Sequence, residues 1–237
     1  MKPKYSIVIG TYNHLHDALI PCIESIKKKT NLEDKEVIIV ANGCNEDTRD
    51  YVKSLGKPFE LVWYNYPLGF PGAYNVGMEH AEGEYIILLN NDIILLDTQE
   101  TDDWIKVLEY PFFTKPNVGI TGPSKFSWQC GNTTRYAIGF WCAMIHRKVI
   151  EDIGLLDEIF SPGMGEDGDY CIRAEEAGYK LIQVPLEGDD EFGTGISNHY
   201  FMIWHKGNGT FDDCRDDKNE VIERNNKILL AKYGEYK

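Results

Sequence analysis

Apolar runs alternate with helix-patterned segments along the first two thirds of the chain, and the clearest run is Tyr85–Leu89. It begins after Gly83 and stops abruptly at Asn90-Asn91-Asp92. An apolar run of this length between a glycine and a polar cluster is typical of a strand buried on both faces. Because α/β proteins bind their ligands at the open ends of such strands, we expect Asp92 at the lip of a cleft.

The same alternation predicts further strands before residue 85, each followed by a helix. The strands are Tyr5–Gly10, Glu36–Ala41 and Phe59–Tyr64. The first helix ends near Lys29, the second covers Glu46–Leu55, and the third follows Pro71-Gly72. Strands that alternate with helices at this spacing form right-handed βαβ units, so the pattern predicts a mainly parallel sheet.

Past Asp92 the rhythm changes, and strands and helices no longer alternate regularly. Helices are predicted over Asp102–Phe113 and Arg147–Ile153. A further helix begins at Glu166, and the amphipathic segment Asn219–Tyr233 forms the last one. Predicted strands cover Val118–Gly122, Ile138–Ile145 and Lys180–Val184. The polar segment Leu186–His199 has no predicted secondary structure. With no repeat or low-complexity linker, the pattern predicts one domain with a C-terminal helical tail.

The chain's acidity narrows the classes of ligand and partner. Its formal net charge is −14, and it has no Lys/Arg block beyond Lys27-Lys28-Lys29, so we expect no nucleic-acid partner. An acidic protein that handles an anionic ligand usually needs a metal ion as intermediary, which favours a cation at Asp92. The alternative for Asp92 is an Asx-rich turn, since Asn and Asp end many strands.

Segments that target proteins or anchor them are not recognisable in the sequence. The chain enters its first predicted strand after four residues, and no run reaches the roughly 20 apolar residues of a membrane span. The six cysteines are scattered, with no C-x-x-C pair or zinc-like cluster. We therefore expect a cytoplasmic protein with reduced, mostly buried thiols.

The first two predicted strands end in residues that carry amides and hydroxyls: Thr11, Tyr12, Asn13 and Asn42. Such groups can contact a base and a ribose, or they can simply form loops. No G-x-G-x-x-G follows the first strand, which argues against NAD. The absence of G-x-x-x-x-G-K-[ST] argues against a P-loop ATPase.

Two further clusters carry candidate chemistry. Glu166-Asp167-Gly168-Asp169 places three carboxylates at a helix start, where the macrodipole alone favours acidic residues. A carboxylate held there in a cleft is also a suitable general base for a hydroxyl nucleophile. His205 lies among aromatic residues and glycines and is either structural or a neutral ligand for a divalent cation.

Taken together, these residues resemble the family 2 glycosyltransferases of the GT-A fold, and the likeness runs from Tyr5 to about Thr210. The motifs follow the family's order: Tyr5–Asn13 as the opening strand and base-contacting loop, Asn65–Gly83 as N-x-x-x-G-x-x-x-A-x-N-x-G, Asn90-Asn91-Asp92 at the D-x-D position, Gly139–Phe160 leading to D-E-x-F, Glu166-Asp167 as E-D, and Trp204-His205 as the late histidine. Each motif alone is weak, but six in the same order are specific.

The resemblance implies an α/β protein of the GT-A (nucleotide-diphospho-sugar transferase) fold, with a mainly parallel central sheet flanked by helices. Residues 1–210 would form the GT-A domain, and residues 211–237 a C-terminal helical tail packed on it. It also implies a hexosyl- or deoxyhexosyltransferase that depends on Mn²⁺ or Mg²⁺ and inverts the sugar it transfers. The expected partners are a nucleoside-diphosphate sugar, with a UDP-sugar favoured, and a hydroxyl of a glycan or other glycoconjugate acceptor.

The resemblance also implies a role for each candidate residue. Asp92 and His205 would bind the metal, and Asp167 would act as the catalytic base. Donor binding would fall to Thr11, Tyr12, Asn13, Asn42, Asn75, Asn90 and Asn91, with Asn75 near the pyrophosphate. Glu166, Asp169 and Trp141 would orient groups or contact the acceptor. Trp141 is either a sugar platform or a core aromatic, and Leu186–His199 would form an acceptor loop or lid.

Two positions depart from the family pattern. Ala41 stands where the family commonly has the Asp that pairs with uracil, and Asn90 replaces the first Asp of D-x-D. A sugar-nucleotide nucleotidyltransferase and a non-catalytic nucleotide-sugar-binding module therefore stay open as alternatives. The glycine-rich basic loop of the first is missing after the opening strand. The joint presence of Asp92, Asp167 and His205 argues against the second.

Overall fold

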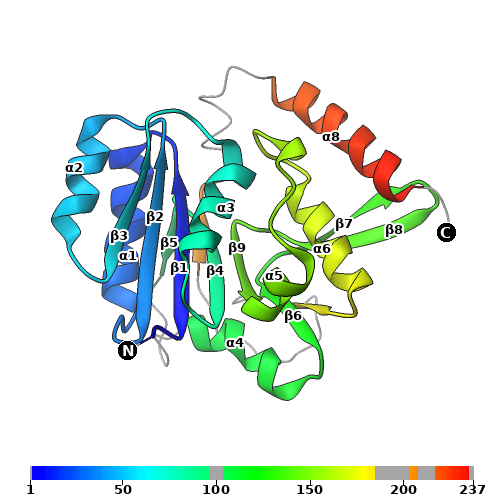
Figure 1. The fold of residues 1–237 in the computed structure, drawn as a ribbon, viewed down its shortest axis with the longest axis horizontal. Helices are drawn as coiled ribbons and strands as arrows, with labels where there is room; N and C mark the ends of the chain where they lie inside the picture. Colours follow the sequence, from blue (N-terminus) through cyan, green and yellow to red (C-terminus); the bar gives the residue numbers. More distant parts are fainter. Residues whose placement is uncertain (1, 97–103, 185–202, 208–216, 235–237) are drawn as a thin grey trace.

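The first part of the chain forms a parallel α/β layer. The computed structural model describes residues 2–96, 104–184, 203–207 and 217–234. Strands and helices alternate up to residue 90 as β1 (Tyr5–Thr11), α1 (Ile20–Lys29), β2 (Lys35–Asn42), α2 (Glu46–Leu55), β3 (Phe59–Tyr64), α3 (Gly69–His80) and β4 (Tyr85–Asn90). β1 pairs in parallel with β2 and β4, and β2 pairs in parallel with β3, which confirms the predicted βαβ units (Figure 1).

The second part extends the same sheet and adds two small ones. In chain order its elements are β5 (Ile93–Leu95), α4 (Trp104–Thr114), β6 (Val118–Gly122), β7 (Lys125–Cys130), β8 (Thr133–Ile138), β9 (Cys142–His146), α5 (Arg147–Ile153), a 3₁₀ turn (Glu158–Phe160), α6 (Glu166–Glu176), β10 (Lys180–Gln183), β11 (Ile203–His205) and α8 (Lys218–Tyr233). The main sheet has seven strands in the order β10-β6-β9-β4-β1-β2-β3. β11 pairs with β5 and β7 pairs with β8, both antiparallel.

The strand predicted over Ile138–Ile145 is wrong, because the chain turns at Gly139–Trp141. β8 ends before this turn and β9 begins after it, and Gly139 N donates to the carbonyl of Ser124, just before β7, at 2.8 Å. β9 then runs antiparallel between β4 and β6. The residues on both sides of the turn are buried, so a continuous apolar run concealed the end of one strand and the start of another.

Most other predicted elements are confirmed to within a residue or two. The helices α2, α5 and α6 and the strands β3 and β6 begin at the predicted residues. The strands β5, β7 and β11 were not predicted, and β8 was not predicted apart from its last residue. The segment Leu186–His199, expected to form an acceptor loop, lies outside the described residues, as does the start of the helix predicted from Asp102.

Side chains alternate along β1 and fill two cores, one on each face of the sheet. Ile7 and Ile9 pack with residues of α1 and α4 such as Ile23 and Leu108, all of them fully buried. Val8 points to the other face, into a cluster with residues of α3, α5 and α6. Figure 1 shows α3 crossing in front of the sheet, on the face opposite α1. Because helices cover both faces, the central strands are continuous apolar runs.

The helix α8 lies across α6 and beside the tip of the β7–β8 hairpin (Figure 1). Its buried side chains are Val221, Asn225 and Leu229. Lys232 Nζ reaches the Asp169 carboxylate of α6 at 2.5 Å. Among the described helices, none combines the length and hydropathy that crossing a membrane requires. The described cysteines are free thiols, and all but the one at position 44 are buried.

Candidate active site

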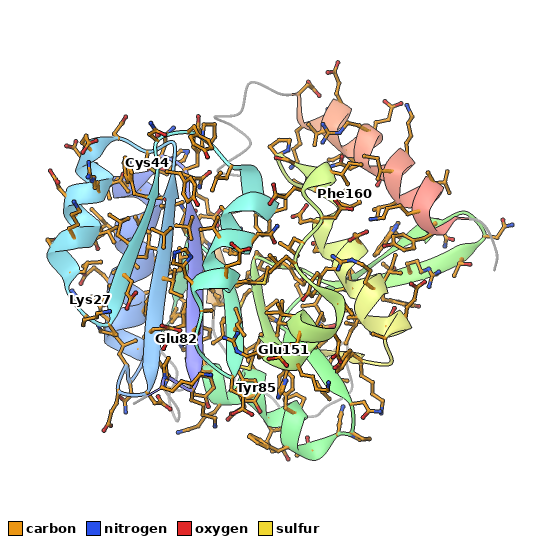
Figure 2. All side chains as sticks on the ribbon, viewed as in Figure 1. Lys27, Cys44, Glu82, Tyr85, Glu151 and Phe160 are labelled. Atoms are coloured by element: carbon orange, nitrogen blue, oxygen red, sulfur yellow. The ribbon has the colours of Figure 1, made fainter. Side chains whose placement is uncertain are left out.

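The carboxyl ends of β1, β2 and β4 lie along one edge of the sheet, where buried amides connect them. In Figure 2, Cys44 marks this edge and Tyr85, at the start of β4, marks the opposite edge. Asn42 Nδ2 donates to Thr11 O at 2.8 Å, and Asn91 Nδ2 donates to Thr11 Oγ1 at 2.9 Å. Three of the predicted donor-binding residues therefore use polar atoms to brace the strand ends.

Two residues beside these amides keep accessible side chains. The backbone turns directly after β1 at Asn13, whose φ is 53°. Tyr12 packs against the glycine that follows β2, because a Cβ on Gly43 would lie 2.9 Å from Tyr12 Cε2. Both Tyr12 and Asn13 are partly exposed. Of the residues predicted at the first two strand ends, these two are therefore the ones available to a ligand.

Asp92 and His205 are far apart in sequence and meet because β5 and β11 form an antiparallel pair. Ile93 lies opposite His205 in this pair, and Lys206 N donates to Asp92 O at 3.1 Å. The Nε2 atom of His205 lies 3.1 Å from Oδ1 of Asp92. The structure therefore brings the two candidate metal ligands together at the open end of β4.

The chemistry of this pair is suited to a cation. Asp92 is 8% exposed, and its Oδ1 is buried without a hydrogen bond of good geometry to the described residues. Asn90 Nδ2 lies 3.3 Å from His205 Nε2, which suits a lone pair on that nitrogen. The 3.1 Å contact between His205 Nε2 and Asp92 Oδ1 is made either through an N–H on that nitrogen or through a metal ion that both atoms bind. A carboxylate oxygen and an imidazole nitrogen are ligands that Mn²⁺ accepts.

The pKa of the Asp92 carboxyl is low in spite of its burial. Burial acts to raise this pKa, but the hydrogen bond and the positive charge of His205 bring it below its ordinary value. Asp92 is therefore ionised at neutral pH. Among the residues that the structure describes, no three His, Cys, Asp or Glu side chains are grouped to hold an ion. A metal here would take two protein ligands and leave other positions to a bound diphosphate.

Trp141 supports the ring of His205. The two rings stack with their centroids 4.7 Å apart and their planes 7° apart. The indole also touches Gly139, where a Cβ would lie 3.0 Å from Trp141 Cδ1 and 3.1 Å from its Nε1. The sequence left Trp141 either as a sugar platform or as a core aromatic, and the structure places its ring against a candidate metal ligand.

Glu166 and Asp167 open α6 at the end of a glycine-rich turn. Met164 and Gly165 have φ values of 72° and 112°, a left-handed backbone that glycine adopts most readily. Glu166 is 5% exposed, and its Oε2 has no hydrogen-bond partner in the described part of the chain. Asp167 Oδ1 accepts a hydrogen bond from Gly168 N at 2.8 Å.

The two neighbouring carboxyls have raised pKa values. Burial raises the pKa of Asp167 to about 6, although the backbone amides of Gly168 and Phe140 hydrogen-bond to its ionised form. Burial also raises the pKa of Glu166 well above its ordinary value, and the charge of Asp167 adds to this effect. The pair therefore favours a neutral Glu166 beside an Asp167 that ionises near neutral pH. Such a carboxylate is suited to accept a proton from a hydroxyl.

The turn at Gly139–Trp141 connects the two halves of the site. Its phenylalanine amide faces Asp167, and its tryptophan ring faces His205. The tryptophan carbonyl also accepts a hydrogen bond from Asn90 N at 2.9 Å, which joins the turn to the end of β4. Sequence reasoning missed this turn by placing it inside a strand, and its glycine was the signal that pointed to it.

Asn75 and Asp169 direct their polar atoms at neighbouring protein groups. Asn75 Nδ2 donates to Leu156 O at 3.0 Å, and Asn75 Oδ1 accepts from Leu156 N at 2.9 Å. Asp169 is fully buried between Arg173 Nε at 2.9 Å and Lys232 Nζ at 2.5 Å. Asn75 therefore ties α3 to the segment after α5, and Asp169 ties α6 to α8. The sequence assigned Asn75 to the pyrophosphate and Asp169 to the acceptor, and both assignments stay predictions.

Solved glycosyltransferase structures share this arrangement of strands and helices. The mannosyltransferase PcManGT from Pyrobaculum calidifontis, in complex with GDP-Man and Mn²⁺, matches with a TM-score of 0.61 and 17% identity over 78% of this chain and 55% of its own. GalNAc-T7 with UDP, GalNAc and Mn²⁺ matches with a TM-score of 0.65 and 17% identity over 77% of this chain and 42% of its own. The fold is the GT-A fold, as the sequence predicted.

Within that class, residues 6–111 match the Glycosyl transferase family 2 profile. The GalNAc(5)-diNAcBac-PP-undecaprenol beta-1,3-glucosyltransferase of Campylobacter jejuni is 32% identical over 98 residues, which cover 40% of this chain and 31% of that protein. The O-antigen biosynthesis protein RfbC of Myxococcus xanthus is 24% identical over 213 residues, which cover 76% of this chain and 16% of that protein. The chain spans less than a third of the length of either relative.

Proposed function

We propose that this chain is a metal-dependent, inverting glycosyltransferase. It moves a single hexose or deoxyhexose from a nucleoside-diphosphate sugar to a hydroxyl of a glycan or glycoconjugate. The observation that carries this proposal is the 3.1 Å contact of the buried Asp92 carboxylate with His205 Nε2 at the open end of β4. The match to the family 2 profile supports it, and both solved structures named above contain Mn²⁺ and a nucleotide or nucleotide sugar.

The donor lies with its diphosphate at Asp92 and His205 and its nucleoside near the end of β1. Mn²⁺ or Mg²⁺, when bound by these two residues, supplies Lewis-acid charge that offsets the charge developing on the leaving diphosphate. Tyr12 and Asn13 contact the base and ribose, because their side chains are accessible beside the braced strand ends. Trp141 keeps the His205 ring in its ligand orientation through the stacked contact.

Asp167 accepts the proton of the acceptor hydroxyl. The hydroxyl oxygen forms its bond to the anomeric carbon on the face opposite the diphosphate, and the bond to the phosphate oxygen breaks with its electron pair. The anomeric configuration is therefore inverted. Glu166 stays neutral beside Asp167, so the ionised Asp167 that awaits the proton has no second negative charge next to it.

A UDP-sugar is the favoured donor, with weak discrimination between bases. Ala41 is fully buried at the end of β2 and offers no carboxylate to the uracil N–H. A hydrogen bond to a charged group contributes about 1.5–3 kcal/mol, so its absence leaves a small difference between UDP and its competitors. Backbone groups near Ala41 and the side chain of Tyr12 contact the base in its place.

Calorimetry of nucleotide sugars with and without Mn²⁺ tests the donor site. The parent should bind UDP-sugars more tightly than GDP- or dTDP-sugars, and only with the metal. Asp92→Asn and His205→Ala should remove the Mn²⁺-dependent binding, because each deletes a protein ligand. His80→Ala, on the exposed end of α3, is the matched control and should bind as the parent does. The proposal fails if the parent binds no nucleotide sugar, or if both site variants bind as well as the parent.

A further inference from the structure

The loop before α6 is held by one side chain of α8. Asn225 is 1% exposed, and its Nδ2 lies near three carbonyl oxygens, those of Phe160 at 3.1 Å, Gly163 at 2.9 Å and Met164 at 2.6 Å. An amide nitrogen carries two hydrogens, so one of these hydrogens is shared between two carbonyls. Figure 2 shows Phe160 beside α8, at the level where this contact occurs.

The loop adopts a backbone conformation that its own sequence does not favour. Met164 has a φ of 72°, in the left-handed region where a side chain is costly. Such a conformation persists only where the surrounding structure determines it. A Cβ on Gly165 would lie 3.5 Å from Asn225 Cβ and 3.5 Å from Leu229 Cδ1, so α8 packs directly on the residue before Glu166.

The orientation of the amide is fixed from its other end. Asn225 Oδ1 accepts a hydrogen bond from Arg224 Nε at 2.9 Å, which leaves Nδ2 to face the loop. The same arginine donates from Nη2 to the carbonyl of Ser161. Three converging carbonyls form a patch of partial negative charge that only a donor can neutralise. An amide supplies that donor, whereas a carboxylate of the same shape would be repelled.

We propose that Asn225 is a positioning residue for the Asp167 carboxylate. It touches neither donor nor acceptor, and it acts through the backbone of Met164 and Gly165, which leads directly into Glu166. The inference rests on the proposed function, in which Asp167 is the base. A displacement of the base by about 1 Å lowers turnover by on the order of 10²-fold. The residues proposed to bind the donor lie at β1, β4 and β11, and the loop that Asn225 holds supplies none of them.

The test compares Asn225→Asp and Asn225→Ala with Asn226→Asp, the next residue on the exposed side of α8. Three quantities are measured: the ¹³C-methyl NMR signal of Met164, turnover, and the calorimetric Kd of the donor with Mn²⁺. The chain has five methionines, so Met164→Leu assigns the signal. Both Asn225 variants should move the Met164 signal and lower kcat by about 10²-fold with an unchanged donor Kd. Asn226→Asp should change none of the three.

Two results would overturn the positioning role. One is an unmoved Met164 signal in Asn225→Ala. The other is a loss of donor affinity that parallels the loss of turnover, because that indicates general unfolding. If Asn225→Asp does not fold, Asn225→Ala gives the same two readings. If the parent itself has no turnover, the proposed function fails, and the Met164 signal still decides whether Asn225 holds the loop.

Discussion

The raised pKa of Asp167 has two opposite consequences. It suits the proposed role as proton acceptor, but it makes the ionised side chain destabilise the folded protein. Burial raises its pKa to about 6, which suits a base that must be ionised near neutral pH. The ionised form is the less stable form in that environment. The residue therefore gains reactivity because the folded protein holds its charge at a cost.

Replacing Asp167 by asparagine should lower turnover by about 10²- to 10⁴-fold, because the amide cannot accept the proton. Donor affinity should stay near that of the parent. In the parent, kcat/KM should rise as the pH passes through about 6 and level off about one unit above it, as Asp167 loses its proton. Steady-state rates from pH 5 to pH 8 measure both effects. A flat profile across this range would contradict the assignment of Asp167 as the base.

The same substitution should make the protein more stable at pH 7.5. The folded pKa of Asp167 lies above its ordinary value of 3.8, so its contribution to stability is fully present below about pH 4 and is lost as the pH rises through about 6. At pH 7.5 the ionised carboxylate costs on the order of 1–2 kcal/mol, reduced for its partial contact with solvent. Asp167→Asn removes this cost.

Urea unfolding at pH 7.5 and at pH 4 measures the change. The urea midpoint of Asp167→Asn should exceed that of the parent at pH 7.5 and match it at pH 4. Asp50→Asn, on the exposed side of α2, serves as the control and should leave both midpoints unchanged. Equal shifts at the two pH values would show that the effect has another origin than the Asp167 charge.

At the scale of elements, the short turn between β8 and β9 contacts both halves of the candidate site. It brings a backbone amide to Asp167, the proposed base, and an aromatic ring to His205, the proposed metal ligand, and it is anchored to the end of β4 by a hydrogen bond of 2.9 Å. A change in this turn should therefore reach both halves of the site. Trp141 is the part of the turn that can be changed most selectively.

Trp141→Ala should weaken Mn²⁺ binding by about 10- to 100-fold, because the His205 ring loses the surface that orients it. Trp141→Phe should have a smaller effect in the same direction, since a ring remains. Gly139→Ala should act like Trp141→Ala, because the added Cβ lies 3.0 Å from the indole Cδ1 and displaces it. Electron paramagnetic resonance of free Mn²⁺ in the presence of UDP gives the affinities.

The control for these variants is Tyr110→Ala on α4, an aromatic side chain that is 66% exposed. Its Mn²⁺ affinity should equal that of the parent. Unchanged affinity in both Trp141→Ala and Gly139→Ala would show that the stacked contact does not support the metal site.

The elements of the first half were predictable because each one follows a simple pattern. The strand Phe59–Tyr64 and the helix Glu46–Leu55 were placed to the residue. Central strands buried on both faces are uninterrupted apolar runs, and the polar residues at their ends mark where they stop. The β8–β9 turn follows no such pattern, because residues on both sides of it are buried against the same core. The hydrophobic pattern of a sequence indicates which residues are buried, and the residues before and after this turn are all buried.

The sequence grouped the candidate site residues, but it did not reveal the contacts that each of their side chains makes. Asp92 and His205 were grouped by motif, and the structure places them in contact. Asn75 was assigned to the donor, yet its amide is used to join α3 to Leu156. Asn225 was not considered, because a polar residue on an amphipathic helix is usually exposed. Such roles depend on contacts between distant segments, which local patterns do not record.

At the scale of the whole molecule, Asp169 is the electrostatic link between α6 and α8. Its fully buried carboxylate accepts from Arg173 Nε at 2.9 Å and from Tyr233 Oη at 2.7 Å, and it pairs with Lys232 at 2.5 Å. Buried ion pairs of this kind destabilise strongly when one partner is removed, because the remaining charge is left without compensation. The C-terminal helix is therefore attached by a contact that does not tolerate partial loss.

Asp169→Asn should destabilise the protein by about 3–5 kcal/mol, measured by urea unfolding at pH 7.5. Glu223→Gln, which removes an exposed pair with Lys227 on the outer side of α8, should leave the unfolding midpoint unchanged. Similar stabilities for the two variants would show that Asp169 does not hold α8 in place.

The contact of Asn225 with the loop before α6 also implies an order in which the proposed functions form during synthesis. Asn225 is translated about 60 residues after Glu166-Asp167, which corresponds to on the order of 3–12 s at usual elongation rates. During that interval the parallel α/β half has already left the ribosome, while the loop before α6 does not yet have its contact with Asn225. His205, which completes the proposed donor site, is translated about 20 residues before Asn225, so we expect a nascent chain to gain donor binding before it gains the ability to transfer sugar.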